Sequence, residues 1–257
     1  MSVRNNLLTF CVLLIFSMVL FSCSENSDDD LKPVAFGSVT DIDGNVYNTI
    51  TIEISDGTLK SSGSSQSVTQ TWMVENLKTT KYANGDPIPN LIQGEDWASS
   101  EEGAYCAYNN DSKILEVYGL LYNWYAVVDE RNIAPEGWHV ATESEWTALI
   151  DYLGGSDVAG GKLKEAGTVH WDKPNTGAGN SIGFNALPGG ARWGGPDATG
   201  SFNVLDSCAY FWTSTKDPSD RWGIYAWRVG LYLTSKSATI ADSNAGNGYS
   251  VRCLKDN

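Results

Sequence analysis

The chain has 257 residues, with 17 Lys and Arg against 31 Asp and Glu, which gives a formal net charge of −14 at pH 7. This charge argues against nucleic acid or an anionic membrane surface as a partner, because both require a basic patch. The 26 Gly, 10 Trp and 12 Tyr are typical of a loop-rich β or α+β domain rather than a helical bundle.

Residues 1–22 have the pattern of a secretory signal peptide. Arg4 precedes an apolar segment, Leu7 to Phe21, which is shorter than the roughly 20 residues that a spanning helix needs. Ser22 and then Cys23 follow, as in a bacterial lipoprotein signal. We predict cleavage before Cys23 and lipidation of its thiol, which would anchor the mature chain to a membrane outside the cytoplasm. The alternative is a signal cleaved elsewhere, with Cys23 incidental.

Residues 23–36 are expected to form an acidic, flexible tether. The run Asp28-Asp29-Asp30 repels itself and stays extended, and Pro33 opposes a helix. The run also resembles the signal that sends lipoproteins of Bacteroidota to the outer face of the outer membrane, so we expect a surface-exposed outer membrane lipoprotein. Removing residues 1–22 removes only Arg4, which leaves 16 basic and 31 acidic side chains and a net charge of −15. About 220 residues remain, enough for one domain over 37–257.

The first part of this domain predicts antiparallel strands. Asp43-Gly44 is a two-residue turn signal, so Val39–Tyr47 is predicted to be a hairpin. Alternation at Ile50, Ile52 and Ile54 predicts a half-buried strand. The Ser- and Gly-rich stretch Ser55–Gln70 predicts an exposed loop, and Trp72–Val74 resumes an apolar strand.

Two main helices are predicted in the middle of the chain. Thr142–Leu153 begins with a capping box formed by Thr142 and Glu145 and carries one apolar face. Val158–Ala166 is a second, shorter helix, weakened by two internal glycines. Tyr118–Val128 is apolar nearly all round and is expected to be a buried helix, with a strand as the alternative.

The remainder predicts loop and strand. Gly167–Pro196 is rich in Gly, Asn, Pro and Trp and is expected to be ordered loop. Alternation over Tyr225–Thr234 and Tyr249–Leu254 predicts two strands, joined through a turn at Ala241–Gly248.

Eight motifs follow one another along the chain: Val39-Thr-Asp-Ile-Asp-Gly-Asn-Val-Tyr47, Gln70-Thr-Trp-Met-Val-Glu-Asn-Leu77, Gly103-Ala-Tyr-Cys-Ala-Tyr-Asn-Asn-Asp111, Tyr118-Gly-Leu-Leu-Tyr-Asn-Trp124, Pro135-Glu-Gly-Trp-His-Val140, Gly183-Phe-Asn-Ala-Leu-Pro-Gly-Gly190, Phe211-Trp-Thr-Ser-Thr215 and Tyr249-Ser-Val-Arg-Cys-Leu-Lys-Asp256. In this order they resemble the Fibrobacter succinogenes major paralogous domain family, over residues 37–257. That family is similar to the C-type-lectin-like fold. The resemblance therefore implies an α+β domain with small antiparallel sheets, two main helices and long ordered loops that carry the binding surface.

The chain departs from the family pattern at two places. The Ser55–Gln70 stretch is longer than is usual, and Ala134 stands where cysteine-rich members carry Cys.

Three cysteines follow Cys23, namely Cys106, Cys208 and Cys253. An exported location permits disulfides, and three thiols allow one bridge in three ways, which the residues themselves leave open. The resemblance favours Cys106–Cys253, because many lipoprotein members of the family pair the Gly-x-Tyr-Cys and Val-Arg-Cys motifs. Cys208 would then remain free.

No catalytic or metal-binding set is visible in the sequence, so we expect no enzyme activity and no cofactor. The two histidines, His139 and His170, lack zinc spacing with the cysteines. We interpret His139 as a hydrogen-bonded packing residue, and nothing near His170 in the sequence suggests a dyad. Asp41-x-Asp43 resembles a calcium loop but lacks the Gly and Glu that an EF-hand requires. Calcium is therefore possible through other carboxylates but is not supported by a motif.

Trp171, Trp193 and Trp222 lie among Gly, Pro, Asn and Asp, and are the candidate ligand-binding residues. Such aromatics can stack on a sugar ring or contact a protein; alternatively, each pins its loop to the core. We expect a surface-anchored, non-catalytic module that binds a glycan or an extracellular protein in adhesion or nutrient capture. Its membrane contact would be through the lipid only, with no nucleic acid partner. The alternative is a structural or tip subunit of a surface appendage or envelope complex.

Overall fold

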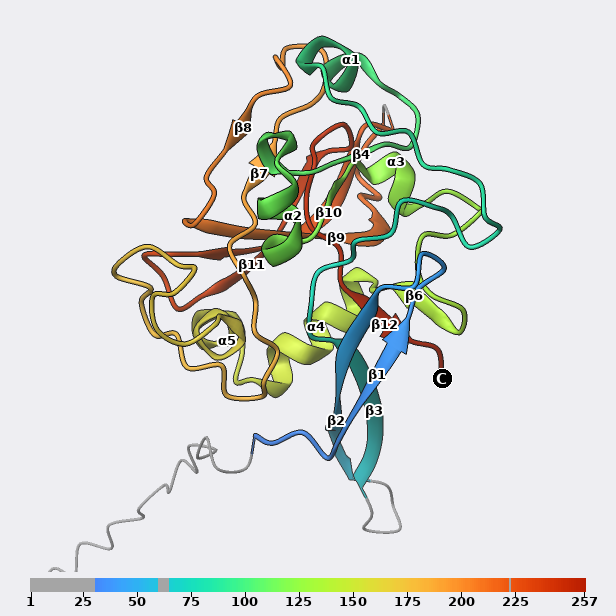
Figure 1. Cartoon of the computed structure of the whole chain (residues 1–257). Coiled ribbons are helices and arrows are strands. Elements are labelled where there is room, and N and C mark those ends of the chain that lie inside the picture. The colour runs from blue at the N-terminus through green and yellow to red at the C-terminus, as the bar shows by residue number, and fades with distance from the viewer. Residues whose placement is uncertain (1–30, 60–64, 222) are drawn as a thin grey trace, which may run out of the picture.

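The computed structural model describes residues 31–59, 65–221 and 223–257 (Figure 1). The predicted signal peptide, Cys23 and the Asp28–Asp30 run lie outside the described residues. The helices are α1 (Gly94–Ser99), α2 (Ser112–Tyr118), α3 (Trp124–Val127), α4 (Glu143–Tyr152) and α5 (Ser156–Leu163). The strands are β1 (Ala35–Thr40), β2 (Val46–Leu59), β3 (Ser65–Met73), β4 (Tyr105–Cys106), β5 (Leu121–Tyr122), β6 (Trp138–Val140), β7 (Ala191–Arg192), β8 (Phe202–Asn203), β9 (Cys208–Lys216), β10 (Tyr225–Tyr232), β11 (Ala238–Asn244) and β12 (Cys253–Lys255).

These elements form the expected α+β fold of small antiparallel sheets. One sheet has the order β1-β2-β3-β12-β6 and a second has the order β11-β10-β9. Two further pairs, β4-β5 and β7-β8, lie in the upper half of the view in Figure 1, near α1. The last strand, β12, is inserted between β3 and β6, so the C-terminal motif closes the first sheet.

The two predicted helices are α4 and α5. The capping box at the start of α4 is formed as expected, with the Thr142 side chain accepting from the Glu145 backbone N–H. The apolar face of α4 buries Trp146, whose ring lies 4.7 Å from that of Trp72 on β3. This packing joins α4 to the first sheet. None of the helices in the described ranges is long and apolar enough to cross a membrane.

The N-terminal predictions need three corrections. The Val39–Tyr47 hairpin is present, but Thr40 pairs with Val46, so its loop has five residues rather than two, because Asp41 organises it. Ser55–Gln70 is not simply an exposed loop: the β2–β3 ladder continues through Ser55↔Ser67 to Leu59↔Ser65, and only 60–64 lie outside the described residues. Polar strands can pair in this way because the ladder needs only backbone groups. Leu31 is buried in the core and β1 begins at Ala35, so residues 31–36 belong to the folded domain rather than the tether.

The expectation for Tyr118–Val128 was wrong. The segment is divided into the end of α2, the short strand β5 and the short helix α3. The chain turns at Gly119, whose φ of +75° is favourable only for glycine. Asn123 then caps α3 by accepting the Ala126 N–H. An apolar run by itself does not distinguish a buried helix from buried turns and short strands.

The predicted strand Tyr225–Thr234 is present as β10, and the predicted loop Gly167–Pro196 is irregular apart from β7. The predictions missed β9 and β11, and β11 extends into the predicted turn Ala241–Gly248. The predicted strand Tyr249–Leu254 is confined to β12, Cys253–Lys255. Ala238–Asn244 is a strand, although its second half carries turn-forming residues. β10 also contains an irregularity between Ala226 and Arg228. This bulge brings Ala226, Val229 and Leu231 into the core, so the uninterrupted alternation that we expected from Tyr225 is broken.

The buried guanidinium of Arg252 links the motifs of the chain. Arg252 is fully buried and donates to Asn76 Oδ1 at 2.7 Å and to the carbonyl of Met73 at 2.9 Å. It also donates to the carbonyls of Phe184 and Asn185 at 3.0 and 3.2 Å. All of these acceptors are neutral, and burial lowers the pKa of the guanidinium. One side chain thus joins β3, the Gly183–Gly190 motif and the strand end at Cys253.

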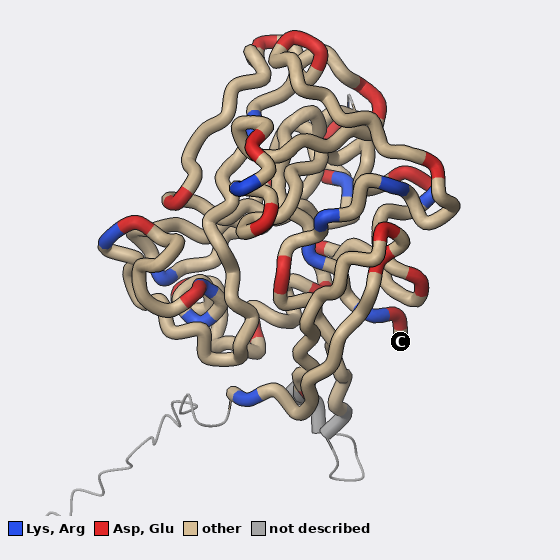
Figure 2. Tube along the Cα trace, in the orientation of Figure 1, with Lys and Arg blue, Asp and Glu red and all other residues tan. Residues whose placement is uncertain are grey.

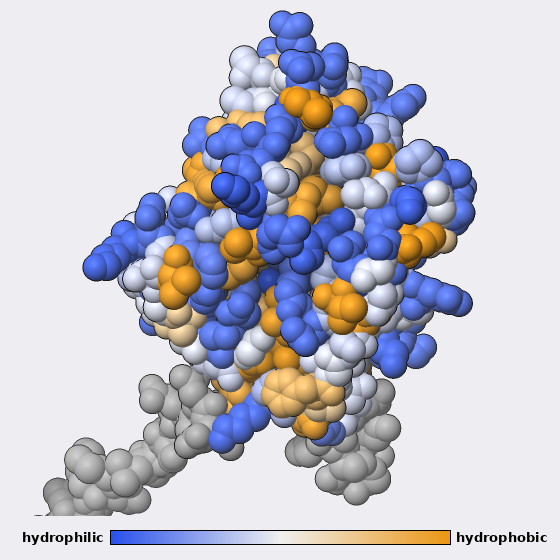
Figure 3. Space-filling model, viewed as in Figure 1, coloured by the Kyte–Doolittle hydropathy of each residue, from blue (hydrophilic) through white to orange (hydrophobic). Residues whose placement is uncertain are grey.

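The surface is acidic and divided into small patches. Figure 2 shows acidic residues gathered at α1, at the top of the view. Figure 3 shows apolar residues as small areas among hydrophilic ones on the same face. The most exposed aromatic side chain among the described residues is Phe36 on β1, at 78%.

Replacing Arg252 by Met should destabilise the domain by at least about 3 kcal/mol, because several buried acceptors lose their donor. Chemical denaturation followed by tryptophan fluorescence measures this change. The matched control is Lys255→Met, an exposed position on β12 three residues further along the chain, which should change the unfolding free energy by less than about 0.5 kcal/mol. Equal effects of the two variants would contradict the role given to Arg252.

Candidate functional site

The strands β7 and β8 carry a glycine-rich loop, 193–201, that is held by one buried arginine. Arg192 Nε donates to the carbonyl of Gly200 at 2.9 Å, and Nη2 donates to that of Ile92 at 2.8 Å. The guanidinium lies over the rings of Trp97 and Phe202, at 4.8 and 4.6 Å. Because a buried cation must have its donors satisfied, Arg192 fixes both ends of the loop against α1.

Close backbone approaches then set the shape of the loop. Gly194 passes so near Gly246 that a Cβ on Gly194 would lie 2.0 Å from the Gly246 carbonyl oxygen. Asn247 Oδ1 accepts the Gly194 N–H at 2.9 Å, and Gly195 donates to Ala98 of α1 at 3.0 Å. The loop is therefore an ordered wall, as the sequence predicted for this region.

A groove of about 530 Å³ lies between this loop and the start of β10, and we call it the Trp193 groove. Its aromatic residues are Trp193, half-buried with its ring edge-on to Tyr249 at 6.4 Å, and Tyr225. Polar groups come from Asp197, Thr199, Ser201, Asn244 and Asn247. Of these, the side chains of Asp197, Thr199 and Ser201 make no hydrogen bond to any other described residue. An apolar wall with free polar groups at its rim can hold a ligand with mixed character.

The other two candidate tryptophans do not join Trp193 in this groove. Trp171 is 1% exposed and donates from Nε1 to the carbonyl of Ala186 at 3.0 Å. The expectation that Trp171 contacts a ligand was therefore wrong, because the ring pins its loop to the core, with Lys164 over its face. Trp222 lies outside the described residues.

A comparison with protein-family models matches residues 67–255 to the Fibrobacter succinogenes major domain. This chain belongs to that family. No curated protein and no solved structure gives a significant match. The Trp193 groove lies within the matched residues. Of the motifs on which the resemblance was based, the first lies outside the match and the last extends one residue beyond it.

The cysteines of this Fibrobacter succinogenes major domain are not paired as we expected. Cys106, Cys208 and Cys253 are all free and buried. Cys106 packs with Trp97 and Leu121, whereas Cys253 lies in a different cluster with Tyr47. The predicted Cys106–Cys253 bridge is therefore absent. Burial raises the pKa of the Cys106 thiol to about 12, which disfavours the reactive thiolate.

Both ring nitrogens of His139 lie within hydrogen-bond distance of carboxylates. Its Nδ1 lies 2.6 Å from Asp256 Oδ1, and its Nε2 lies 3.0 Å from both carboxylate oxygens of Glu145. Glu145 is also the capping-box residue of α4, so the imidazole connects this helix to the C-terminus. Hydrogen bonds to Glu145 and then Asp256 raise the pKa of His139 to about 9, against the opposing effect of burial.

Sequence reasoning missed a carboxylate–imidazole pair at His170. Glu165 Oε1 lies 2.8 Å from His170 Nδ1, and Tyr118 packs edge-on against the imidazole at 5.7 Å. The only sequence signal was a Glu five residues before the His in a glycine-containing loop. The loop conformation, which brings the two side chains together, could not be predicted from that spacing.

The acidic turn that resembled a calcium loop has its carboxylates engaged. Asp41 Oδ1 accepts the backbone N–H of Asn45 at 2.9 Å, and Oδ2 accepts the Tyr47 hydroxyl at 2.6 Å. Asp43 accepts the Thr80 N–H at 2.6 Å and pairs with Lys81 at 3.0 Å. Within the described ranges, no three His, Cys, Asp or Glu side chains are grouped to hold a metal.

His139→Gln should lower stability in a pH-dependent way. The folded pKa is raised, so the stabilisation by His139 is fully present below its unfolded pKa of roughly 6.5 and is lost as the pH rises through about 9. At pH 6 we expect a loss of about 1 kcal/mol, because the ring is partly exposed and solvent screens the pairs. Urea unfolding of both proteins between pH 6 and 10 measures the difference; a difference that stays constant with pH would contradict this account.

Proposed function

We propose that this chain is a surface-anchored, non-catalytic binding module that recognises a glycan through the Trp193 groove. The observation that carries the proposal is the half-buried Trp193 in a groove that is also lined by the free side chains of Asp197, Thr199 and Ser201. A sugar ring has the same two kinds of surface, an apolar face and hydroxyl edges. Stacking on an indole with hydrogen bonds around it satisfies both.

Preorganisation supports the proposal. Arg192 and Asn247 hold the glycine-rich wall of the groove before any ligand arrives. A wall that is already ordered loses little conformational entropy on binding, which favours affinity. Arg192 and Asn247 therefore keep the loop rigid. The side chains of Asp197, Thr199 and Ser201 remain available to a ligand.

The predicted location of the protein on the cell surface also supports the proposed binding function. Cys23 follows a lipoprotein-like signal, and the Asp28–Asp30 run resembles a surface-export signal. We infer an outer membrane lipoprotein on the cell surface, with a C-type-lectin-like arrangement of its loops. There it would act in adhesion or nutrient capture. His139 does not favour catalysis, since both of its ring nitrogens face carboxylates that position α4 and the C-terminus.

A glycan array probed with the purified chain, in calcium and in chelator, tests this function. Trp193→Ala should weaken any glycan binding by about tenfold or more, because a buried aromatic at a contact centre contributes on the order of 2 kcal/mol. Tyr225→Leu should weaken it as well. Circular dichroism checks that both variants remain folded.

The matched control is Phe36→Ala, which removes an exposed aromatic on β1, outside the groove. It should leave binding unchanged. A blank array in both conditions, or equal loss with Phe36→Ala, would overturn the assignment of the groove.

The second candidate function is a structural subunit of a surface appendage or envelope complex. Strand β1 favours it: it is an edge strand of uncharged residues with Phe36 exposed. Native edge strands are usually protected by charge or proline within the strand. Here Phe36→Lys should release the chain from any envelope complex that co-purifies with it, measured by sedimentation, whereas Trp193→Ala should not.

A further inference from the structure

A tight turn in the wall of the Trp193 groove carries a free carboxylate. The backbone N–H of Ala198 donates to the carbonyl of Gly195 at 3.0 Å, which closes a β-turn. Pro196 occupies the second position of this turn, where its fixed φ is favourable. Asp197 follows at the third position, and it is exposed, lines the groove and has no hydrogen bond or ion pair with any other described residue. The turn therefore presents an unused acceptor at the groove.

A free amide lies beside this turn. Asn244, at the end of β11, accepts the backbone N–H of Gly246 with its side-chain oxygen Oδ1 at 2.9 Å. Its Nδ2 carries two N–H donors, and neither is bonded to another residue in the described ranges. A Cβ on Gly195 would lie 2.9 Å from this nitrogen, so a side chain there would cover it. Glycine at 195 thus leaves a donor open next to the acceptor, and both Asn244 and Asp197 line the groove.

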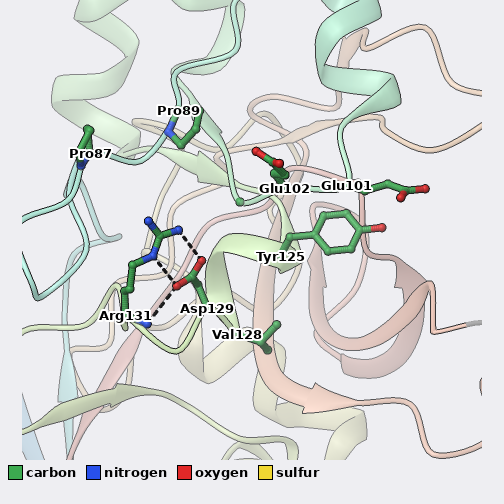
Figure 4. Close-up of a pocket in the computed structure, with 9 residues that line it drawn as sticks. Pro87, Pro89, Glu101, Glu102, Tyr125, Val128, Asp129 and Arg131 are labelled. Atoms are coloured by element: carbon green, nitrogen blue, oxygen red, sulfur yellow. Dashed lines mark hydrogen bonds and ion pairs between the residues drawn. The ribbon is translucent and has the colours of Figure 1, made fainter.

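No positive charge in the groove balances Asp197. The described residues that line the groove include no Lys, Arg or His, and the buried guanidinium of Arg192 donates to backbone carbonyls instead. A hollow beside Tyr125 shows the contrasting arrangement (Figure 4). There, Nε and Nη2 of Arg131 donate to the two carboxylate oxygens of Asp129 at 2.8 and 2.7 Å. Asp129 is occupied by that bidentate pair, whereas Asp197 keeps its full capacity to accept hydrogen bonds.

We propose that Asp197 and Asn244 determine the sugar specificity of the Trp193 groove by binding two adjacent hydroxyl groups of a neutral sugar ring. Each hydroxyl can donate one hydrogen bond and accept others. The carboxylate accepts from the hydroxyls in charge-assisted bonds, and the amide donates to a hydroxyl oxygen. Trp193 packs against the apolar face of the ring. This inference rests on the glycan function proposed for the groove and narrows it to one class of sugar.

The same carboxylate excludes acidic glycans. A uronic acid, a sialic acid or a sulfated sugar would place a second negative charge near Asp197 with no cation to offset it, and like charges repel. The net charge of −14 acts in the same direction. Specificity then comes from repulsion of the wrong ligand as well as attraction of the right one. Because the hydroxyls donate directly to the carboxylate, binding needs no bridging metal ion.

The test is a glycan array that includes matched pairs of tetrasaccharides in the same linkage, mannotetraose with tetramannuronate and cellotetraose with tetraglucuronate. The members of a pair differ only in whether each ring carries a hydroxymethyl group or a carboxylate. We expect the purified full chain to bind neutral members and to bind their acidic counterparts at least about tenfold more weakly, equally in calcium and in chelator. Equal binding of both members of a pair, or binding in calcium alone, would overturn the inference.

Asp197→Asn isolates the carboxylate. It should weaken binding of the neutral sugar by about tenfold, because a charged acceptor is lost, and should strengthen binding of the acidic counterpart. The melting temperature should not change, since Asp197 has no partner in the described part of the chain. The matched control is Asp242→Asn, which removes an exposed carboxylate of β11 outside the groove and changes the net charge equally. Equal effects of the two variants would assign the selectivity to net charge and overturn the role of Asp197.

Trp193→Ala separates this inference from the glycan function on which it rests. Neutral binding that is lost in Trp193→Ala but unchanged in Asp197→Asn would keep the glycan function and overturn the specificity assigned to Asp197. An array without any bound glycan would overturn both.

Discussion

The buried guanidinium of Arg252 is the interaction on which the arrangement of this domain depends. Its donors reach Asn76 and the carbonyls of Met73, Phe184 and Asn185, which belong to segments far apart in the sequence. A charge with no water around it is tolerated only when each donor has an acceptor. The acceptors must therefore assemble around it, and in doing so they close β12 onto β3. The family motifs containing these residues are in this sense requirements of folding rather than of ligand binding.

The same physical solution recurs at two further buried cations. Arg192 donates to carbonyls of the loop around Gly200 and of the segment before α1, and Lys164 Nζ donates to the carbonyls of Thr176, Tyr232 and Ser235. Long loops carry many carbonyls without sheet or helix partners, and unpaired buried carbonyls are unfavourable. Buried cations with several donors satisfy groups of them at once. A loop-rich chain thereby acquires rigid loops, and rigid loops are what a recognition surface needs.

The negative net charge of the chain affects which ligands its surface can bind. With a net charge of −14, the field favours neutral or cationic ligands over anionic ones. The Trp193 groove offers such a ligand an indole and the hydroxyl groups of Thr199 and Ser201. The groove borders α1, because the backbone N–H of Gly195 donates to the carbonyl of Ala98 on that helix. This short helix thus helps to position one wall of the groove.

The sequence by itself determined the family, the α+β class, the capped helix α4, the β10 strand and the ordered state of the glycine-rich loops, because these follow from local periodicity, caps and motif order. It did not determine how Tyr118–Val128 divides, that Ala238–Asn244 is a strand, or which tryptophan faces outward. Trp171 and Trp193 have similar neighbours in the sequence, yet one is buried over Ala186 and the other lines a groove. The unpaired cysteines and the Glu165–His170 pair show the same limit. The spacing of two residues along the chain determines neither the distance between their side chains nor whether they are in contact. Those outcomes depend on which distant segments the buried cations bring together, and that is decided only by the packed tertiary structure.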